Sequence, residues 1–175
     1  MSWAAYQGAA RELVHLLKFQ GIRPVAKFFA LALSELPLPD VDAIVPMPLG
    51  PGRLRQRGFN QALDIARHLG QARALPVIVA GLRRRRETHA QTGLTQEQRV
   101  ANVRGAFIAS PAHDIRRRRL LLLDDVLTTG ATARSAAQAL VRAGAGEVHV
   151  VTVARADLIG RTAPRGAAPG KEVAA

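Results

Sequence analysis

Two adjacent carboxylates and the hydroxyl-rich turn behind them are the residues of this sequence best suited to chemistry. Asp124 and Asp125 follow the apolar run 120–123. The turn then consists of Thr128, Thr129, Gly130, Ala131 and Thr132. Carboxylates accept hydrogen bonds from neighbouring sugar hydroxyls, and amides and hydroxyls at a helix N-terminus stabilise an anion. The combination predicts a phosphorylated-sugar site in which the carboxylates hold a ribose and the turn holds a phosphate.

Other interpretations of the paired acids fit the sequence less well. Acids after a strand often only cap the next helix, but here a Thr-Thr-Gly-x-Thr turn follows them. A receiver domain also carries paired acids after an apolar strand, but near its start, whereas only one clear strand follows here and ends at Arg155 and Asp157. No Gly-x-x-x-x-Gly-Lys-Ser/Thr stretch is present, which excludes a Walker-type phosphate loop.

Arginine-rich segments could bind a second anion. Arg53, Arg55 and Arg57 follow the turn Pro46-Met47-Pro48, and residues 83–86 are all arginine. Either segment could clamp a pyrophosphate group, although a solvated basic face is an equally simple interpretation.

Residues 83–104 show no period except a short helix signal at Thr95, where Gln98 completes a capping box. Long segments of this kind inside compact domains are often lids, which predicts a flexible hood over the site. The hood would bring Arg83, Gln91 and Arg99 towards a charged leaving group. His89 could act there as a general acid or base, or could simply be exposed.

The elements that must position these residues follow from the apolar periodicity. It predicts helices at 10–17, 25–36, 60–69 and 133–143, with Asn60 as the cap of the third. Strands are predicted at 41–45, 77–79, 106–108, 120–123 and 147–153. Four consecutive apolar residues at 120–123 are typical of a strand covered on both faces of a parallel sheet, and ligands bind at the carboxyl edge of such sheets.

Composition limits the other possibilities. The chain has 175 residues and no cysteine, which excludes disulfides, cysteine zinc sites and thiol nucleophiles. We expect one domain at 1–157 and a disordered tail at 158–175, where the sequence becomes rich in Gly, Pro, Ala and Arg. Because there is no signal peptide and no apolar stretch of about 20 residues, we expect a cytoplasmic protein without membrane insertion.

The charge balance favours anionic partners. Lys and Arg number 25 against 13 Asp and Glu, a net charge of +12. Phosphates, pyrophosphate and nucleic acid are all compatible with this excess, and solvated arginine faces could also account for it. Aromatic residues make up only 4%, so the composition supplies few rings for a stacking platform that would bind single-stranded nucleic acid.

The stretch Asp-Asp-Val-x-Thr-Thr-Gly-x-Thr at 124–132 resembles the phosphoribosyl pyrophosphate motif of type I phosphoribosyltransferases. Other stretches resemble the ComF family, which is linked to competence for DNA uptake; they lie at 6–21, 46–48, 57–61, 83–91 and 99–107. The resemblance extends to about residue 155. ComF proteins often begin with a cysteine-based zinc module, and this sequence departs from that pattern because it contains no cysteine.

The resemblance implies a type I phosphoribosyltransferase-like α/β fold, with a central, mainly parallel sheet flanked by helices and a flexible hood. It implies binding of phosphoribosyl pyrophosphate, or a nucleotide, with Mg²⁺, and transfer of the phosphoribosyl group to an undetermined nitrogenous acceptor. An alternative on the same scaffold is a non-catalytic adaptor or regulator that handles single-stranded DNA with the competence machinery. A homodimer is compatible with either.

Site roles implied by the resemblance fall into three groups. Asp124, Asp125 and Arg83 would be catalytic, with Asp124 and Asp125 also weak Mg²⁺ ligands. The other ligand-binding residues would be Pro46, Met47, Pro48, Arg57, Asn60, Gln91, Arg99, Thr128, Thr129, Gly130, Ala131 and Thr132. The loop after Pro46 would bind the pyrophosphate.

Overall fold

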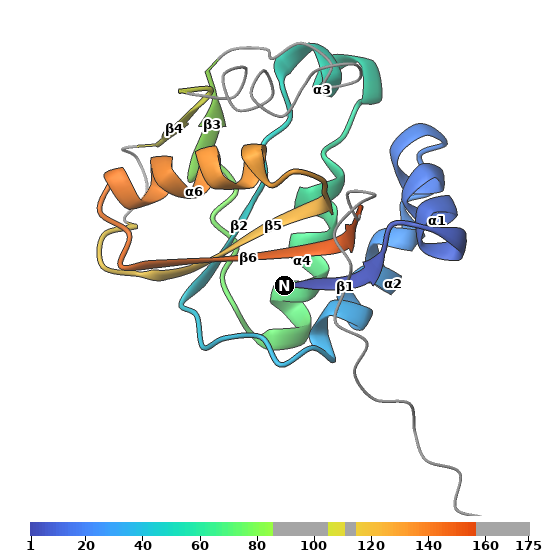
Figure 1. The fold of residues 1–175 in the computed structure, drawn as a ribbon, viewed down its shortest axis with the longest axis horizontal. Coiled ribbons are helices and arrows are strands. Elements are labelled where there is room, and N and C mark those ends of the chain that lie inside the picture. The colour runs from blue at the N-terminus through green and yellow to red at the C-terminus, as the bar shows by residue number, and fades with distance from the viewer. Residues whose placement is uncertain (86–104, 111–114, 157–175) are drawn as a thin grey trace, which may run out of the picture.

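A parallel sheet of four strands, in the order β1-β6-β5-β2, forms the centre of the fold (Figure 1). The computed structural model describes residues 1–85, 105–110 and 115–156. The strands are β1 Ser2–Ala5, β2 Ala43–Pro46, β5 Arg119–Leu127 and β6 Glu147–Arg155. Every neighbouring pair is parallel. The predicted α/β class with a mainly parallel sheet is therefore confirmed.

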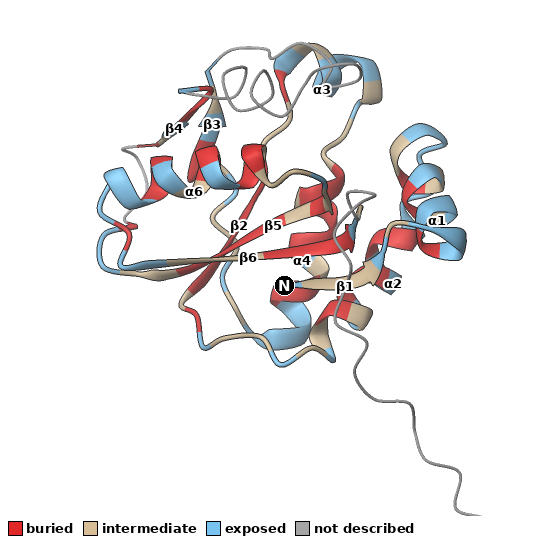
Figure 2. Cartoon of the chain, in the orientation of Figure 1, coloured by how far each residue is buried: buried red, intermediate tan, exposed pale blue. Residues whose placement is uncertain are grey.

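Strand β5 lies in the middle of the sheet and forms the centre of the core. Residues 120–123 are completely buried, as expected of a strand covered on both faces. Helix α6, Ala131–Arg142, packs on one face, and α4, Gln61–Arg73, packs on the other (Figure 1). Buried positions recur along both helices between exposed ones (Figure 2). The carboxyl end of β5 is thus held rigidly between two helices.

Local signals explain how the helices begin and end. Asn60 caps α4 as predicted, because its Oδ1 accepts hydrogen bonds from the amides of Ala62 and Leu63. Helix α1 spans Gly8–Phe19, and α2 spans Pro24–Ser34 and packs against α4. The loop predicted after residues 46–48 is partly wrong, since α3 forms at Pro51–Arg57. Pro51 starts this short helix, and Gly58 ends it in the left-handed conformation at φ 78°.

Three strand predictions need correction. The strand predicted at 77–79 reduces to a single bridge between Val77 and Ile44, because a turn closed by the hydrogen bond from the amide of Gly81 to the carbonyl of Ile78 ends the pairing. Strand β1 was not predicted, since four residues carry too little periodicity to stand out. The loss of pattern from Arg83 onward is also contradicted: β3, Leu82–Arg84, pairs antiparallel with β4, Phe107–Ala109.

Several predictions lie outside the described residues. These are the hood, with Gln91, Arg99 and His89, the short helix at Thr95 and the tail at 158–175. Within the described ranges, none of the helices is long and apolar enough to cross a membrane.

Candidate functional site

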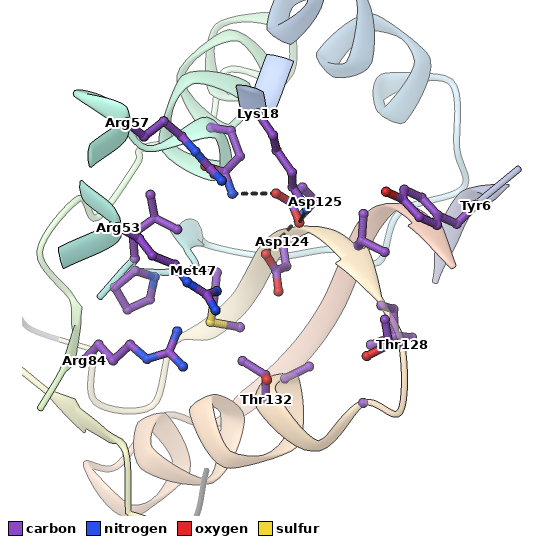
Figure 3. Close-up of a pocket in the computed structure, with 17 residues that line it drawn as sticks. Tyr6, Lys18, Met47, Arg53, Arg57, Arg84, Asp124, Asp125, Thr128 and Thr132 are labelled. Carbon is purple, nitrogen blue, oxygen red and sulfur yellow. Dashed lines mark hydrogen bonds and ion pairs between the residues drawn. The ribbon is translucent and has the colours of Figure 1, made fainter. Parts of the chain in front are cut away.

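A cleft of about 320 Å³ opens where β2 and β5 end side by side (Figure 3). The chain leaves β2 through α4 towards Val77 on one side, and leaves β5 through α6 towards β6 on the other. Adjacent parallel strands whose connections diverge in this way leave a crevice at their carboxyl ends, and ligands of open α/β sheets bind there. Sheet topology thus places the cleft next to the paired acids and the Thr-rich turn.

Asp124 and Asp125 lie within β5 and not beyond its end, which corrects the predicted position. The strand continues because Asp124 is in register with Thr152 of β6 and Val126 with Ala154. Successive side chains on a strand point to opposite sides, so two neighbouring carboxylates acquire different surroundings. Both line the cleft, but they do so with different partners.

Asp125 is buried and held by two other elements. Nζ of Lys18, on α1, lies 2.8 Å from Oδ1 of Asp125, and the side-chain amide of Gln61, on α4, donates a hydrogen bond to Oδ2. Arg57 in turn donates to Oε1 of Gln61. The side chains of Lys18 and Asp125 are only 18% and 7% exposed. Asp125 therefore fixes α1 and α4 at the edge of the cleft.

Asp124 is the carboxylate with the more unusual electrostatics. Burial, followed by the negative charge of Asp125, raises the pKa of Asp124 to about 7. Its Oδ1 accepts a hydrogen bond from the amide of Asp125 at 2.9 Å, and no salt bridge to Asp124 forms within the described part of the chain. A carboxylate in this state would gain from a ligand that donates hydrogen bonds or carries positive charge.

The Thr-rich turn forms the wall beside Asp124. Gly130 adopts φ 75° and precedes the first residue of α6, so the helix begins two residues earlier than predicted. Thr128 and Thr132 line the cleft, and the amide of Ala131 donates a long hydrogen bond of 3.4 Å to Oγ1 of Thr129. The N-terminus of a three-turn helix, with its positive dipole end, is suited to a phosphate.

Arginines form the opposite wall. Arg53 and Arg57 reach into the cleft from α3, and Arg84 reaches in from β3 (Figure 3). Burial lowers the pKa of Arg57. Arg84 also lies over the ring of Phe107, with 5.4 Å between the guanidinium carbon and the ring centroid. The cleft therefore combines a concentration of positive charge on one side with a helix N-terminus on the other.

Arg84, and not the predicted Arg83, lines the cleft. Arg83 is exposed, and because alternate strand residues point in opposite directions, only one of the two can face the site. Nothing in a run of four arginines reveals which one that is.

Some of the remaining predicted residues line the cleft, and others support the loop beside it. Met47, Pro48 and Arg57 line the cleft. Asn60 supports the loop, since its amide donates a 3.0 Å hydrogen bond to the carbonyl of Met47. Pro46 ends β2. Thr129 lies in the turn and Ala131 is the first residue of α6, and neither lines the cleft.

Tyr6 and Lys18 also line the cleft and were not predicted as site residues. Both lie in the 6–21 segment that resembles ComF, which was the available signal. Lys18 is far from Asp125 along the chain, so sequence reasoning could not find their ion pair.

Comparison with known proteins agrees with this geometry. The profile of the phosphoribosyl transferase domain family matches residues 54–167. The chain belongs to this family, and its relatives place it in the ComF branch.

Those relatives are similar over most of the chain. It is 33% identical over 155 residues to Competence protein F of Haemophilus influenzae, covering 82% of this chain and 67% of the relative. It is 32% identical over 165 residues to DNA utilization protein YhgH of Escherichia coli K12, covering 87% and 70%. For Competence protein ComFC of Streptococcus pneumoniae the identity is 31% over 151 residues, covering 86% and 65%. The chain thus spans about two thirds of the length of these relatives.

Among solved structures, the chain is similar to the glutamine phosphoribosylpyrophosphate amidotransferase of B. subtilis in complex with ADP and GMP. The TM-score is 0.48 at 23% identity, and the match covers 74% of this chain and 25% of that one.

Proposed function

We propose that the cleft binds phosphoribosyl pyrophosphate and that the protein transfers the phosphoribosyl group to a nitrogenous acceptor. The observation that carries the proposal is the order of groups across the cleft. A phosphate-type turn lies at one wall, guanidinium groups lie at the other, and Asp124, with its raised pKa, lies between them. This order matches a ligand with a phosphate at one end, a pyrophosphate at the other and hydroxyls in the middle.

In the proposed complex, the turn of residues 128–132 and the N-terminus of α6 hold the 5′-phosphate. Asp124 accepts hydrogen bonds from the ribose hydroxyls. Asp125 contributes mainly by fixing Lys18 and Gln61, because both of its carboxylate oxygens already have partners. Arg53, Arg57 and Arg84 take the pyrophosphate together with the loop after Pro46.

The proposed reaction breaks the bond from the anomeric carbon to pyrophosphate and forms a bond to the acceptor nitrogen, which loses its proton. Positive charge develops on the sugar ring while negative charge develops on the leaving group. Fixed guanidinium groups stabilise the leaving group, and the nearby carboxylates stabilise the ring. Positive charge that develops on the ring favours the ionised form of Asp124, which the free protein disfavours.

Magnesium fits this cleft as an ion that arrives with the phosphates. No cluster of three or more His, Cys, Asp or Glu side chains able to hold a metal occurs in the described ranges. Mg²⁺ is commonly held by one or two carboxylates together with substrate phosphates and water. Asp124, with a weaker contribution from Asp125, would supply the protein ligands. The bound ion would neutralise the pyrophosphate.

Calorimetry with phosphoribosyl pyrophosphate and Mg²⁺ tests the binding step. We expect Asp124→Asn to weaken binding roughly 10- to 100-fold, since a hydrogen bond to a charged group contributes about 1.5–3 kcal/mol. Asp42→Asn is the matched control, because Asp42 lies at the other end of the sheet and should leave the affinity unchanged. Equal affinity of wild type and Asp124→Asn would overturn the assignment. Pyrophosphate release across a panel of nitrogenous acceptors tests the transfer step.

A second candidate function is the handling of single-stranded DNA by a non-catalytic adaptor or a regulator. The names of the relatives, which refer to competence and DNA utilization, and the net charge of +12 favour it. Salt-dependent DNA binding that persists in Asp124→Asn, without pyrophosphate release from any acceptor, would support the adaptor. DNA binding that changes when phosphoribosyl pyrophosphate is added would support the regulator. A cytoplasmic location belongs to both proposals, and the homodimer stays a prediction.

A further inference from the structure

A second cleft, of about 620 Å³, adjoins the first at the end of α1 and along α3. Lys18, Arg53 and Arg57 line both clefts. The other lining residues are Phe19, Gln20, Gly21, Gln56 and Phe59, so that no acidic side chain is found among the described residues around this cleft. The cleft is therefore positively charged and contains two of the five phenylalanines of the chain.

Phe19 is exposed to solvent, unlike a phenylalanine of the core. Its side chain is 67% exposed although it is large and apolar. The guanidinium carbon of Arg57 lies 5.6 Å from its ring centroid, and the ring of His15 packs on it at 4.7 Å. An exposed aromatic ring flanked by a guanidinium group and an imidazole ring offers a stacking surface for another flat ring.

Positive charge continues from this cleft across α2 and α4. The guanidinium carbon of Arg23 lies 5.7 Å from the ring centroid of Phe59, and Arg23 also lines a hollow of about 490 Å³ with Lys27, Arg67 and His68. The one acid of this hollow, Asp64, is paired with Arg23 at 2.8 and 3.0 Å. The cationic surface thus extends well beyond the size of a single small ligand.

We propose that this surface, defined by Phe19, Phe59, Arg23, Lys27 and Arg67, binds single-stranded DNA, with a base stacked on Phe19 and the phosphates along the cations. The inference rests on the second candidate function and gives it a location. Cationic grooves with interspersed aromatic rings are how proteins bind single strands without sequence preference. A duplex would not suit the surface, because its base faces are already stacked and cannot reach Phe19.

The low aromatic content of the chain does not oppose this proposal. Composition indicated a poorly supplied stacking platform, but folding brings Phe19 and Phe59 to one cleft. Three cationic side chains line this cleft, and three more line the neighbouring hollow. What matters for stacking is where the rings lie, and few are needed when phosphates supply most of the affinity.

Fluorescence anisotropy with a labelled oligothymidylate about 16 nucleotides long tests the proposal in the full-length chain. We expect Phe19→Ala to weaken binding roughly 5- to 100-fold with an unchanged salt dependence, because the lost contact is a stacked base. Lys27→Gln and Arg67→Gln should each weaken binding and reduce the slope of log affinity against log salt by about 0.7. Phe28→Ala is the matched control, since Phe28 is also an exposed phenylalanine, at 48%, but contacts Trp3 away from the cleft.

The possible outcomes distinguish an error in the proposed DNA-binding surface from an error in the DNA-handling function. If the wild type does not bind the oligonucleotide, both the DNA-handling candidate and this surface are wrong. If the wild type binds and Phe19→Ala binds equally well, only the surface is wrong. Equal binding of a duplex of the same length, or equal competition by polyglutamate, would show that charge alone is involved and would also overturn the proposal. Calorimetry with phosphoribosyl pyrophosphate should give the same affinity for Lys27→Gln and Arg67→Gln as for the wild type, because neither residue lines the first cleft.

Discussion

The charged side chains at the two ends of β5 differ in how completely they are paired. At the amino end, Arg119 forms ion pairs with Asp40 and Asp42, and its own amide donates a 2.7 Å hydrogen bond to Asp42. At the carboxyl end, Asp124 and Asp125 adjoin each other, and only Asp125 forms an ion pair within the described residues. One strand thus has a cluster of ion-paired charges at its amino end and an incompletely paired cluster at its carboxyl end.

Solvent explains why the two clusters differ. Arg119 and Asp42 are 39% and 38% exposed, and the hydrogen bond from Arg119 lowers the pKa of Asp42. Asp124 is half-buried in the cleft, and desolvation raises its pKa instead. Charge at the amino end is stabilised by its own ion pairs, whereas Asp124 at the carboxyl end forms no ion pair with a described residue. The difference distinguishes a structural ion pair from the proposed binding site on the same strand.

The largest expected effect comes from breaking the enclosed ion pair. Lys18→Met leaves Asp125 as a buried charge without its cation, so we expect the free energy of unfolding at pH 7 to fall by about 3–5 kcal/mol. Urea denaturation measures this change. The double variant Lys18→Met/Asp125→Asn should recover most of the loss, because no unpaired charge remains. If Lys18→Met were as stable as the wild type, the ion pair of Lys18 and Asp125 would not contribute to stability as expected.

The pH dependence of stability is the next largest effect. Since the folded-state pKa of Asp124 is raised to about 7, the folded protein holds this proton more tightly than the unfolded chain. Both states are protonated well below pH 4, and stability is lost as pH rises from about 4 to about 7. Asp124→Asn cannot titrate, so it should gain roughly 2–4 kcal/mol relative to wild type across this range and remain level above it.

Thermal unfolding of both proteins at several pH values, without ligand, measures that difference. The other titrating groups cancel because they are common to the two proteins. A stability difference that does not change with pH would show that the pKa of Asp124 is ordinary.

Glycines near the two ends allow a matched comparison of backbone strain. Gly130 precedes α6 with φ 75°, and Gly144 lies before β6 with φ 97°. A side chain at such angles costs about 1–2 kcal/mol, so Gly130→Ala and Gly144→Ala should both lower the melting temperature. Only Gly130→Ala should also weaken binding of phosphoribosyl pyrophosphate, measured by calorimetry, because only Gly130 shapes the phosphate turn. Equal weakening by both variants would indicate a general loss of structure.

The smallest effect is expected at the exposed amino end. Arg119→Gln removes the partner of Asp40 and Asp42, but water can solvate both carboxylates in its place. We expect the melting temperature to fall by only a few degrees and the affinity for phosphoribosyl pyrophosphate to stay unchanged. A loss as large as that of Lys18→Met would remove the proposed contrast between the two ends.

Strong local patterns made part of the fold predictable. The four leucines of 120–123 indicated a strand buried on both faces, and Asn60 indicated the start of α4; both predictions are confirmed. The pairing of β1 with β6 was not predictable, because Ser2 and Thr152 meet only through the tertiary fold. Helix α3 was missed because Pro51, Gly52 and its arginines provide no apolar period.

By itself, the sequence determined the chemical types in the site and their order: two carboxylates, then a Thr-rich turn at the start of a helix. Only the tertiary structure decided how the two carboxylates differ. Asp125 binds Lys18 and Gln61, whereas Asp124 forms no ion pair with a described residue. The same holds for Arg84, which lines the cleft where Arg83 was expected. The physical reason is that neighbouring strand residues point in opposite directions, and strand register and helix packing settle which of them meets the cleft.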